Sequence, residues 1–495
     1  RDLMGRHNSV ISVIGDGALT GGMAYEALNN ASQLKSNYII ILNDNNMSIS
    51  ANIGGISRHL NSIRSAVPYN KLKNSLAGVL SKIPKVGDGI IRHIVKTKSL
   101  IKQVFLPGML FENMGITYWG PVDGHDIEAL TRVLKEAKEI NRAVVIHVLT
   151  QKGRGYGPAE DNPSRFHGVE PFDIRTGLPK KEKTGETYTD VFSQTMMELA
   201  EEYPELVAVT AAMPDGTGLT PFARAYPKRF FDVGIAEQHA VTFAAGMAAG
   251  GLRPVVAVYS SFLQRAYDQI LHDVCIQNLP VIFAVDRAGL VGSDGETHQG
   301  IFDLSYLSEI PNMTIIAPKN KYELREAFRC AMTISGPVAV RYPRGQACEA
   351  MAEYHAPFIC GKSELIHPGR DVVFLAVGSM VQVAWEVQKR LQEERGIDGT
   401  LVNVRFVKPL DTVILDALVR DHSLFVTMEE NVLSGGFGEH VGGYLHHQNL
   451  PVRLLSIAIP DMYVEHGNVD ILKREVGIDA DSVYARVCQA LEERD

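Results

Sequence analysis

Short apolar runs alternate with segments of helical periodicity along almost the whole chain. This alternation is typical of repeated strand–helix units, in which parallel strands are buried on both faces. The first run is followed by a glycine-rich turn and by a helix whose apolar positions we take to be Met23, Ala27, Ala31 and Leu34. Strands are expected at residues 10–14, 38–42, 144–149, 207–210, 230–233, 255–258, 281–285, 314–317, 338–341, 372–377, 401–404, 424–427 and 452–456.

The repeats fall into three series, which predicts an α/β protein of three domains with mainly parallel sheets. We place the domains at residues 1–185, 186–360 and 361–495. The first domain ends in a loop-rich linker, residues 151–185, and contains an insertion at about 46–112 that breaks the rhythm of the repeats.

The insertion is strongly basic in its middle. Residues 58–102 hold ten Lys and Arg but a single acid, Asp88. A surface for nucleic acid would interleave aromatic side chains for base stacking, and these are nearly absent. We therefore interpret the segment as a solvated, mobile insertion rather than as a nucleic-acid site.

The composition excludes several classes of protein. Hydrophobic residues make up 45% of the chain and charged residues 21%, as in folded globular domains. The net charge of −8 argues against a nucleic-acid partner, and no apolar run approaches the ~18–20 residues of a membrane span. Since the five cysteines are scattered without a CxxC pair, we expect neither disulfides nor a zinc site. Free thiols also fit a reducing compartment, so we expect a cytoplasmic location.

The beginning of the sequence is unusual. It starts with Arg1-Asp2-Leu3 rather than with methionine, and it lacks the basic start and apolar stretch of a signal peptide. The first expected strand follows within a few residues. We therefore expect the sequence to begin inside a domain, with further sequence upstream.

Polar residues follow the first two expected strands. Gly15-Asp16-Gly17-Ala18 comes directly after the first strand, and Asn45 follows the second. Asp16 and Asn45 are 29 residues apart (45 − 16), which fits one strand–helix–strand unit and places both where open α/β sheets bind ligands. A carboxylate and an amide oxygen suit Mg²⁺, which completes its shell with phosphate oxygens. Glycines at this turn let the backbone approach a diphosphate closely.

Two other interpretations of this segment are weaker. A dinucleotide fingerprint starting at Gly15 requires glycine at position 20, where the chain has Thr20, and the next glycine is Gly21. Asp16 could instead cap the helix that follows it. Capping alone would not account for Asn45 at the matching position of the next strand.

A second group of candidate residues follows the strands of the middle domain. Glu237 comes after the strand at 230–233 and starts a Gly/Ala-rich helix, where the helix dipole by itself favours an acid. Phe262 stands in Ser261-Phe262-Leu263-Gln264-Arg265, and an isolated aromatic side chain is most often part of the core. Neither residue alone defines a site.

Several motifs in the right order resemble those of one enzyme family. Gly15-Asp16-Gly17 followed by Asn45 is similar to the metal–diphosphate motif of thiamine diphosphate enzymes of the transketolase type. Within that class, the chain resembles the 1-deoxy-D-xylulose-5-phosphate synthase family over essentially its whole length. The segments that carry the resemblance are Lys152–Tyr156, Phe166-His167, Ile235–Phe243, Ser261–Arg265, Asp286–Gly289, Asp294–Gly300, Arg341–Gly345, Glu429–Asn431 and Ser434–Gly438.

The resemblance implies a transketolase-like fold that binds thiamine diphosphate and Mg²⁺. It implies the condensation of pyruvate with D-glyceraldehyde 3-phosphate to 1-deoxy-D-xylulose 5-phosphate and CO₂, which serves isoprenoid, thiamine and pyridoxal synthesis. A homodimer is the implied assembly. A transketolase, a 2-oxoacid dehydrogenase-type enzyme and a catalytically incompetent fragment of the synthase are the alternatives.

The resemblance also implies roles for individual residues. Asp16, Asn45 and the main-chain carbonyl of Met47 would bind Mg²⁺, and Glu237 would share a proton with the aminopyrimidine ring of the cofactor. The remaining implied roles are cofactor contact for Gly17, Ala18, Tyr156 and Phe262, proton transfer for His298 and His167, and substrate binding for Tyr259, Arg265, Arg287, Asp294 and Arg344.

Members of this family carry a further N-terminal stretch. It holds a histidine near the reacting carbon and a Gly-His-Ser segment at the diphosphate, and neither has a counterpart in the sequence before Asp16. We therefore expect this polypeptide alone to bind thiamine diphosphate weakly and to turn over slowly.

Overall fold

A computed structural model describes residues 1–48, 52–65, 109–169, 171–180 and 185–493. The chain divides into two compact units. Unit 1 comprises Arg1–Glu182 with Val233–Ala236, and unit 2 comprises Lys183–Asp232 with Glu237–Asp495. The larger part of the expected basic insertion, residues 66–102, lies outside the described residues.

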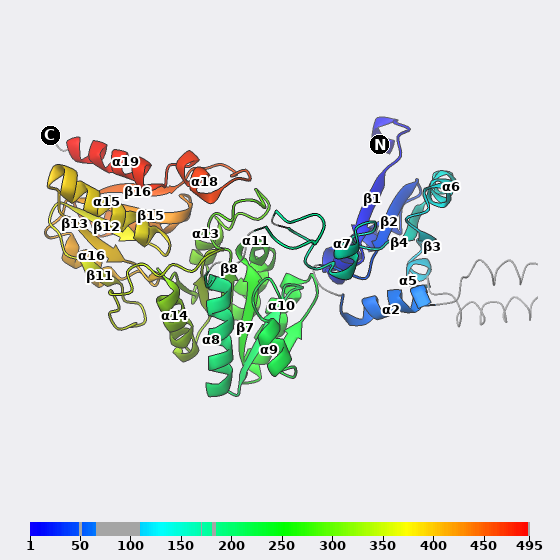
Figure 1. The fold of residues 1–495 in the computed structure, drawn as a ribbon, viewed down its shortest axis with the longest axis horizontal. Coiled ribbons are helices and arrows are strands. Elements are labelled where there is room, and N and C mark those ends of the chain that lie inside the picture. The colour runs from blue at the N-terminus through cyan, green and yellow to red at the C-terminus, as the bar shows by residue number, and fades with distance from the viewer. Residues whose placement is uncertain (49–51, 66–108, 170, 181–184, 494–495) are drawn as a thin grey trace, which may run out of the picture. The chain divides into compact units, whose positions relative to one another are not determined.

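Unit 1 is built on a four-stranded parallel sheet in the order β1-β2-β4-β3 (Figure 1). Apolar residues of β2 and β4 are buried on both faces, since Ile40 belongs to one hydrophobic cluster and Ile39 to another. The strands are β1 (Ile11–Gly15), β2 (Tyr38–Asp44), β3 (Thr117–Asp123) and β4 (Ala143–Leu149). The helices are η1 (Asp2–Met4), η2 (Gly17–Thr20), α1 (Gly22–Ala31), α2 (Gly54–Ser65), α5 (Met109–Asn113), α6 (Ile127–Ala137) and α7 (Gly157–Asp161).

The helix expected after the first strand is present as α1, but its buried face differs from the expected one. Leu28 and Ala31 are buried and Ala24 packs against the same hydrophobic cluster, whereas Met23 is 68% exposed. Leu34 lies beyond the end of the helix and is exposed. The positions 24, 28 and 31 also form a stripe at helical spacing, so periodicity alone does not decide which stripe faces the sheet.

Unit 2 contains a seven-stranded sheet in the order β14-β9-β10-β8-β7-β5-β6, parallel except for β14. Phe192 of α8 and Phe328 of α14 pack on one of its faces, with ring centroids 5.1 Å apart. Its strands are β5 (Leu206–Thr210), β6 (Phe230–Asp232), β7 (Arg253–Tyr259), β8 (Ile282–Asp286), β9 (Thr314–Ile316), β10 (Val338–Arg341) and β14 (Phe406–Lys408). The helices around it are α8 (Tyr188–Glu202), α9 (Thr220–Ala225), α10 (Glu237–Ala249), α11 (Ser260–Leu263), η3 (Gln264–Ala266), α12 (Tyr267–Gln269), η4 (Ile270–Cys275), α13 (Asp303–Ser308) and α14 (Lys321–Thr333).

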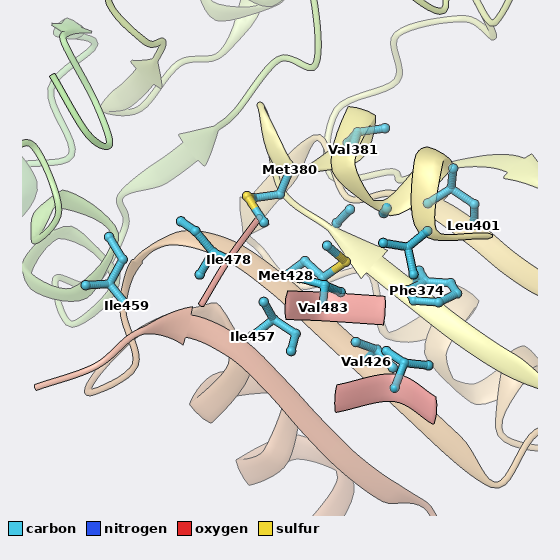
Figure 2. Packing of buried hydrophobic residues seen from close by; sticks show 14 of the residues in the cluster. Phe374, Met380, Val381, Leu401, Val426, Met428, Ile457, Ile459, Ile478 and Val483 are labelled. Carbon is cyan, nitrogen blue, oxygen red and sulfur yellow. The ribbon is translucent and has the colours of Figure 1, made fainter. Parts of the chain in front are cut away.

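A second, five-stranded sheet of unit 2 has the order β11-β13-β12-β15-β16, with β11 as an antiparallel edge strand. Figure 2 shows its core, where Phe374, Val426 and Ile457 of three neighbouring strands pack with Val483 of α19. The strands are β11 (Glu364–His367), β12 (Val372–Ala376), β13 (Gly399–Asn403), β15 (Leu424–Val432) and β16 (Arg453–Ile459). The helices are α15 (Met380–Arg395), α16 (Thr412–Leu418), α17 (Phe437–His447), α18 (Val469–Glu475) and α19 (Ala480–Glu492).

Two features join the sheets of unit 2. The chain leaves β13 of the smaller sheet and adds β14 to the edge of the larger one, where Phe406 pairs with Ile316. The second feature is a buried ion cluster that consists of Lys319, Glu323, Glu364 and Arg405. Glu364 belongs to β11 of the smaller sheet, and Lys319 and Arg405 stand next to β9 and β14 of the larger one. The Lys319 Nζ is 2.9 Å from Glu323 Oε1 and 2.6 Å from Glu364 Oε2, and Arg405 contacts the same two carboxylates at 2.7 and 3.1 Å.

All thirteen expected strands overlap an observed strand, and the α/β class with mainly parallel sheets is confirmed. The strands β3, β11 and β14 are additional. The boundaries of the three domains remain a prediction. Among the described residues, no helix has both the length and the apolar character needed to cross a membrane.

Candidate active site

The carboxyl ends of β1 and β2 lie side by side, as the spacing of Asp16 and Asn45 predicts. Gly15 pairs with Asn43 in the parallel ladder, and the amide of Asp16 donates to the Asn43 carbonyl at 3.1 Å. Asp16 directly follows β1, and Asn45 directly follows β2. Both residues therefore stand at the edge of the sheet where open parallel sheets bind ligands.

The carboxylate of Asp16 is buried beside a second carboxylate. Asp16 occupies the N-cap position of η2, but its side chain accepts no capping hydrogen bond from the described residues of that helix, so the capping interpretation fails. Its Oδ2 accepts a hydrogen bond from Asn52 Nδ2 at 2.8 Å. Burial and the neighbouring Asp44 raise the pKa of Asp16 to about 7. A pair of buried carboxyl groups favours a bound cation, so this environment fits Mg²⁺.

A tight turn after β2 places Asn45 and Met47 close together. The Oδ1 of Asn45 accepts a hydrogen bond from the Met47 amide at 3.0 Å. Asn46 between them has a φ of 63°, a left-handed conformation that asparagine tolerates better than most residues. The turn therefore presents both expected metal ligands of this loop from one short, hydrogen-bonded segment.

The turn before α1 approaches the same loop closely. A Cβ on Gly17 would lie 2.9 Å from the Cβ of Ser48 and 3.1 Å from Asn52 Oδ1. Ala18 follows in the same η2 turn, and its carbonyl accepts from the Gly21 amide at 3.1 Å. The close packing leaves no room for a side chain at position 17, which fits a backbone segment that a diphosphate would approach.

The expected metal ligands differ from a cluster of His, Cys, Asp and Glu side chains. Within the described part of the chain, no group of three or more His, Cys, Asp and Glu residues could hold a metal ion. The expected set of one carboxylate, one amide oxygen and one main-chain carbonyl would not form such a group. An ion bound there would need oxygens from its ligand, as Mg²⁺ commonly does with phosphates.

Lys152 connects this loop to His167, and the sequence assigns it no role. Its Nζ donates to the Ser48 carbonyl at 2.8 Å and lies 2.9 Å from His167 Nδ1. Burial, with a smaller contribution from the Lys152 charge, lowers the pKa of His167. Burial also lowers the pKa of Lys152, which Asp16 partly opposes. The signal that could have found Lys152 is its place in the KGRGY segment.

Tyr156 lies in the same loop-rich segment, at the N-cap position of α7. Its hydroxyl donates to the Ile174 carbonyl at 2.7 Å. Its ring packs edge-to-face on Phe166 at a centroid distance of 5.6 Å and contacts Phe172 at 6.0 Å. These contacts are made with residues of the same segment, 151–178. The expected contact of Tyr156 with a cofactor remains a prediction.

In unit 2, Glu237 and Arg265 form one ion pair. Glu237 is the first residue of α10 and is 3% exposed. Its Oε2 lies 2.5 Å from Nη1 of Arg265, which follows α11 in η3. Burial raises the pKa of Glu237, and the Arg265 charge opposes that shift. The sequence predicts separate tasks for these two residues and does not predict their contact.

Four further candidates of unit 2 are in contact with one another. Arg287 lies over the ring of Tyr259, with Cζ 3.6 Å from the ring centroid. Tyr259 stacks on Phe262 at 5.5 Å, and Phe262 meets the ring of His298 edge-to-face at 5.2 Å. Burial raises the pKa of Tyr259 to about 12, so its hydroxyl stays protonated at neutral pH. Phe262 is thus part of a cluster of candidate residues rather than of the hydrophobic core alone.

Arg344 and Asp294 form a second ion pair. The Nη1 of Arg344 lies 2.8 Å from Asp294 Oδ2, and both side chains are partly exposed. The charges of both residues act on the hydroxyl of Tyr259. Asp286, which has no predicted role, is fully buried behind Arg287, and burial raises its pKa to about 6. The structure therefore gathers the expected substrate residues of unit 2 around Tyr259, apart from Arg265.

Three family models match the chain in succession. Residues 1–150 match the model of 1-deoxy-D-xylulose-5-phosphate synthase, residues 185–349 that of the transketolase pyrimidine-binding domain, and residues 361–483 that of the transketolase C-terminal domain. Among solved structures, a split-gene transketolase in an inactive β4 tetramer is 30% identical, covers 62% of this chain and 99% of its own, and has a TM-score of 0.56. The transketolase of Campylobacter jejuni, 16% identical over 97% of this chain and 77% of its own, has a TM-score of 0.54 and supports the fold alone. The chain thus has the transketolase-like fold.

Curated relatives narrow this class further. A 1-deoxy-D-xylulose-5-phosphate synthase of Lachnoclostridium phytofermentans is 54% identical over 99% of this chain and 78% of its own length. Synthases of the same name from Pelotomaculum thermopropionicum and Clostridium tetani are 51% and 49% identical, over 100% and 99% of this chain and 78% and 79% of their own lengths. The chain belongs to the 1-deoxy-D-xylulose-5-phosphate synthase family.

Proposed function

We propose that this protein condenses pyruvate with D-glyceraldehyde 3-phosphate to 1-deoxy-D-xylulose 5-phosphate and CO₂, with thiamine diphosphate as its cofactor. The observation that carries this function is the 54% identity to a synthase of that name over 99% of the chain. The protein is a transferase of the transketolase type, and its product would feed the synthesis of isoprenoid precursors.

The residues at the ends of β1 and β2 fit the diphosphate and its metal ion. The Asp16 carboxylate, the Asn45 amide oxygen and the Met47 carbonyl would hold Mg²⁺, and the buried carboxyl group of Asp44 beside Asp16 supports a cation there. The backbone around Gly17 would face the diphosphate. Bound thiamine diphosphate supplies the nucleophilic carbon and the electron sink that decarboxylation of a 2-oxoacid requires.

The residues of unit 2 fit the organic part of the cofactor and the substrates. Glu237 would hold a proton at the aminopyrimidine ring, since burial raises its pKa above the usual value of a glutamate and so favours sharing of a proton. Phe262 would pack against that ring. His298, whose ring contacts Phe262, would exchange a proton with the substrate, and His167 in unit 1 would do the same from its own loop.

The cationic residues would bind the phosphate of the acceptor substrate. Arg287 and Arg344 both act electrostatically on Tyr259, which supports a common binding region for a phosphorylated aldehyde. Tyr259 and Asp294 would orient its hydroxyl groups. Arg265, which forms an ion pair with Glu237, would also contact this phosphate.

An assay with alternative substrates tests the function. We expect product from pyruvate and glyceraldehyde 3-phosphate but none from the ketose phosphate donors of transketolases. Calorimetry with thiamine diphosphate and Mg²⁺ should show binding that Asp16→Ala abolishes. Turnover of ketose phosphates would favour a transketolase, and an absence of both binding and turnover would favour an incompetent fragment.

We also propose a cytoplasmic location and a homodimeric assembly. Support for the location comes from the five cysteines, which are all free thiols, as a reducing compartment would keep them. The homodimer rests on the family resemblance. Native mass spectrometry of the purified protein measures the assembly directly, and a monomer would contradict it.

A further inference from the structure

A row of three polar side chains, the buried Asp44 and His147 and the half-buried Tyr118, lies next to the proposed Mg²⁺ site in unit 1. The Nε2 of His147 lies 2.8 Å from Asp44 Oδ2, and its Nδ1 lies 2.8 Å from the hydroxyl of Tyr118. His147 and Asp44 are almost completely buried. The three residues come from the adjacent strands β2, β4 and β3.

The row interrupts a mostly apolar face of the sheet. Leu42 and Val145, two residues before Asp44 and His147 on their strands, belong to the hydrophobic cluster of that face. Phe111 of the same cluster stacks on Tyr118 at 5.8 Å. Burying polar groups on such a face is costly unless every partner is satisfied, and each ring nitrogen of His147 has a partner here. An apolar row would serve the core equally well, so the polar row requires another explanation.

The second carboxylate oxygen of Asp44 offers this explanation. While its Oδ2 contacts His147, its Oδ1 accepts a hydrogen bond from the Asn46 amide at 3.2 Å. Asn46 is the left-handed residue of the turn that presents Asn45 and Met47. The Asp44 carboxylate thus connects His147 and Tyr118 to the turn that carries two of the expected metal ligands.

We propose that His147 and Tyr118 are positioning residues for the Mg²⁺ site, acting through Asp44. His147 orients the Asp44 carboxylate, Tyr118 orients the imidazole, and Asp44 holds the turn in the conformation that presents the ligands. None of the three is among the expected metal ligands. This inference rests on the proposed Mg²⁺ site. Partners of this outer kind typically change metal affinity about 10–100-fold when they are removed.

The test measures Mg²⁺ affinity in the 495-residue protein at a fixed concentration of thiamine diphosphate. Calorimetry gives the dissociation constant, and the fluorescence of Trp119, the neighbour of Tyr118 in β3, gives an independent reading. We expect Tyr118→Phe and His147→Leu each to weaken Mg²⁺ binding about 10–100-fold. His147→Gln, which keeps a donor for Asp44, should recover much of the affinity.

A matched control separates positioning from general loss of stability. Ile146→Ala opens a cavity on the opposite face of β4, in the other hydrophobic cluster, and should lower the melting temperature without weakening Mg²⁺ binding. Equal Mg²⁺ affinity in Tyr118→Phe and the unchanged protein would overturn the inference, even if His147→Leu fails to fold. So would an equal loss in Ile146→Ala. If the unchanged protein binds no Mg²⁺ with thiamine diphosphate, the proposed metal site fails instead.

Discussion

Arg265 and Glu237 form an ion pair in which guanidinium Nη1 and carboxylate Oε2 are 2.5 Å apart. The family resemblance gives the two residues separate tasks, phosphate binding for the arginine and cofactor contact for the glutamate. Because Glu237 is buried and Arg265 opposes the rise of its pKa, a change at either residue affects the other.

Arg265→Met should therefore weaken the binding of thiamine diphosphate as well as that of the phosphorylated substrate. We expect a loss of roughly tenfold in cofactor affinity, equivalent to one hydrogen bond to a charged group. Calorimetry with thiamine diphosphate and Mg²⁺ measures it. Arg344→Met is the matched control, because its partner is Asp294, and it should raise only the KM for glyceraldehyde 3-phosphate. Equal cofactor affinity in the two variants would contradict the coupling.

Lys152→Met should raise the pKa of His167. Burial and the Lys152 ammonium lower this pKa, so removing the charge returns part of the shift while burial keeps the remainder. NMR of ¹³C-labelled histidine as a function of pH measures the change. A lowered folded-state pKa stabilises the protein above about pH 6.5, the value of an unfolded histidine, and this contribution is lost as the pH falls. The variant should lose less stability on acidification, whereas Lys138→Met, at the C-cap of α6, should behave as the unchanged protein.

Gly17→Ala should impair the metal loop, because the added Cβ would lie 2.9 Å from Ser48 Cβ. We expect a loss of about 1–3 kcal/mol in the free energy of unfolding, as for other overpacked sites, together with weaker Mg²⁺ binding. Chemical denaturation and Mg²⁺ titration measure the two effects. Gly22→Ala, five residues later with open space around its Cβ position, should leave both nearly unchanged or raise stability slightly. Similar behaviour of both variants would show that the close approach at Gly17 is unimportant.

Glu364→Gln should destabilise unit 2 strongly. It leaves Lys319 and Arg405 with Glu323 as the remaining carboxylate of the buried ion cluster. Removing one partner of a buried pair costs about 3–5 kcal/mol, because it leaves charge without compensation in the interior. Urea unfolding followed by the fluorescence of Trp385 in α15 measures it. Glu198→Gln, which breaks an exposed pair with Arg329, should cost at most about 1 kcal/mol.

Much of the fold could be predicted from the sequence because buried parallel strands are continuous apolar runs. The strands that escaped prediction lack this signature. Gly120 and Pro121 interrupt β3 at an irregularity in its pairing, β11 is a short antiparallel edge strand, and β14 has three residues before Pro409. The buried face of α1 also escaped, since two stripes of the helix have the same spacing.

The candidate site, too, could be predicted from the sequence only in part. The neighbouring positions of Asp16 and Asn45 follow from the length of one strand–helix–strand unit, which local patterns reveal. The contact of His147 with Asp44 joins residues 103 positions apart, and that of Lys152 with Ser48 joins residues 104 apart. Such contacts depend on strand order and register, which the local patterns of a single sequence do not reveal.

The position of β14 has a consequence for how the protein matures. The edge of β9 in the seven-stranded sheet is covered by residues 406–408, which are synthesised after the strands β11, β12 and β13 of the neighbouring sheet. On the ribosome, the larger sheet must therefore wait with an open edge until about ninety further residues have emerged from the end of β9 (408 − 316 = 92). An unpaired edge strand is a template for association with other chains. A polypeptide that stopped at residue 360 would leave β9 as the edge strand of this sheet, so we expect nascent or shortened chains to associate more readily than the 495-residue chain.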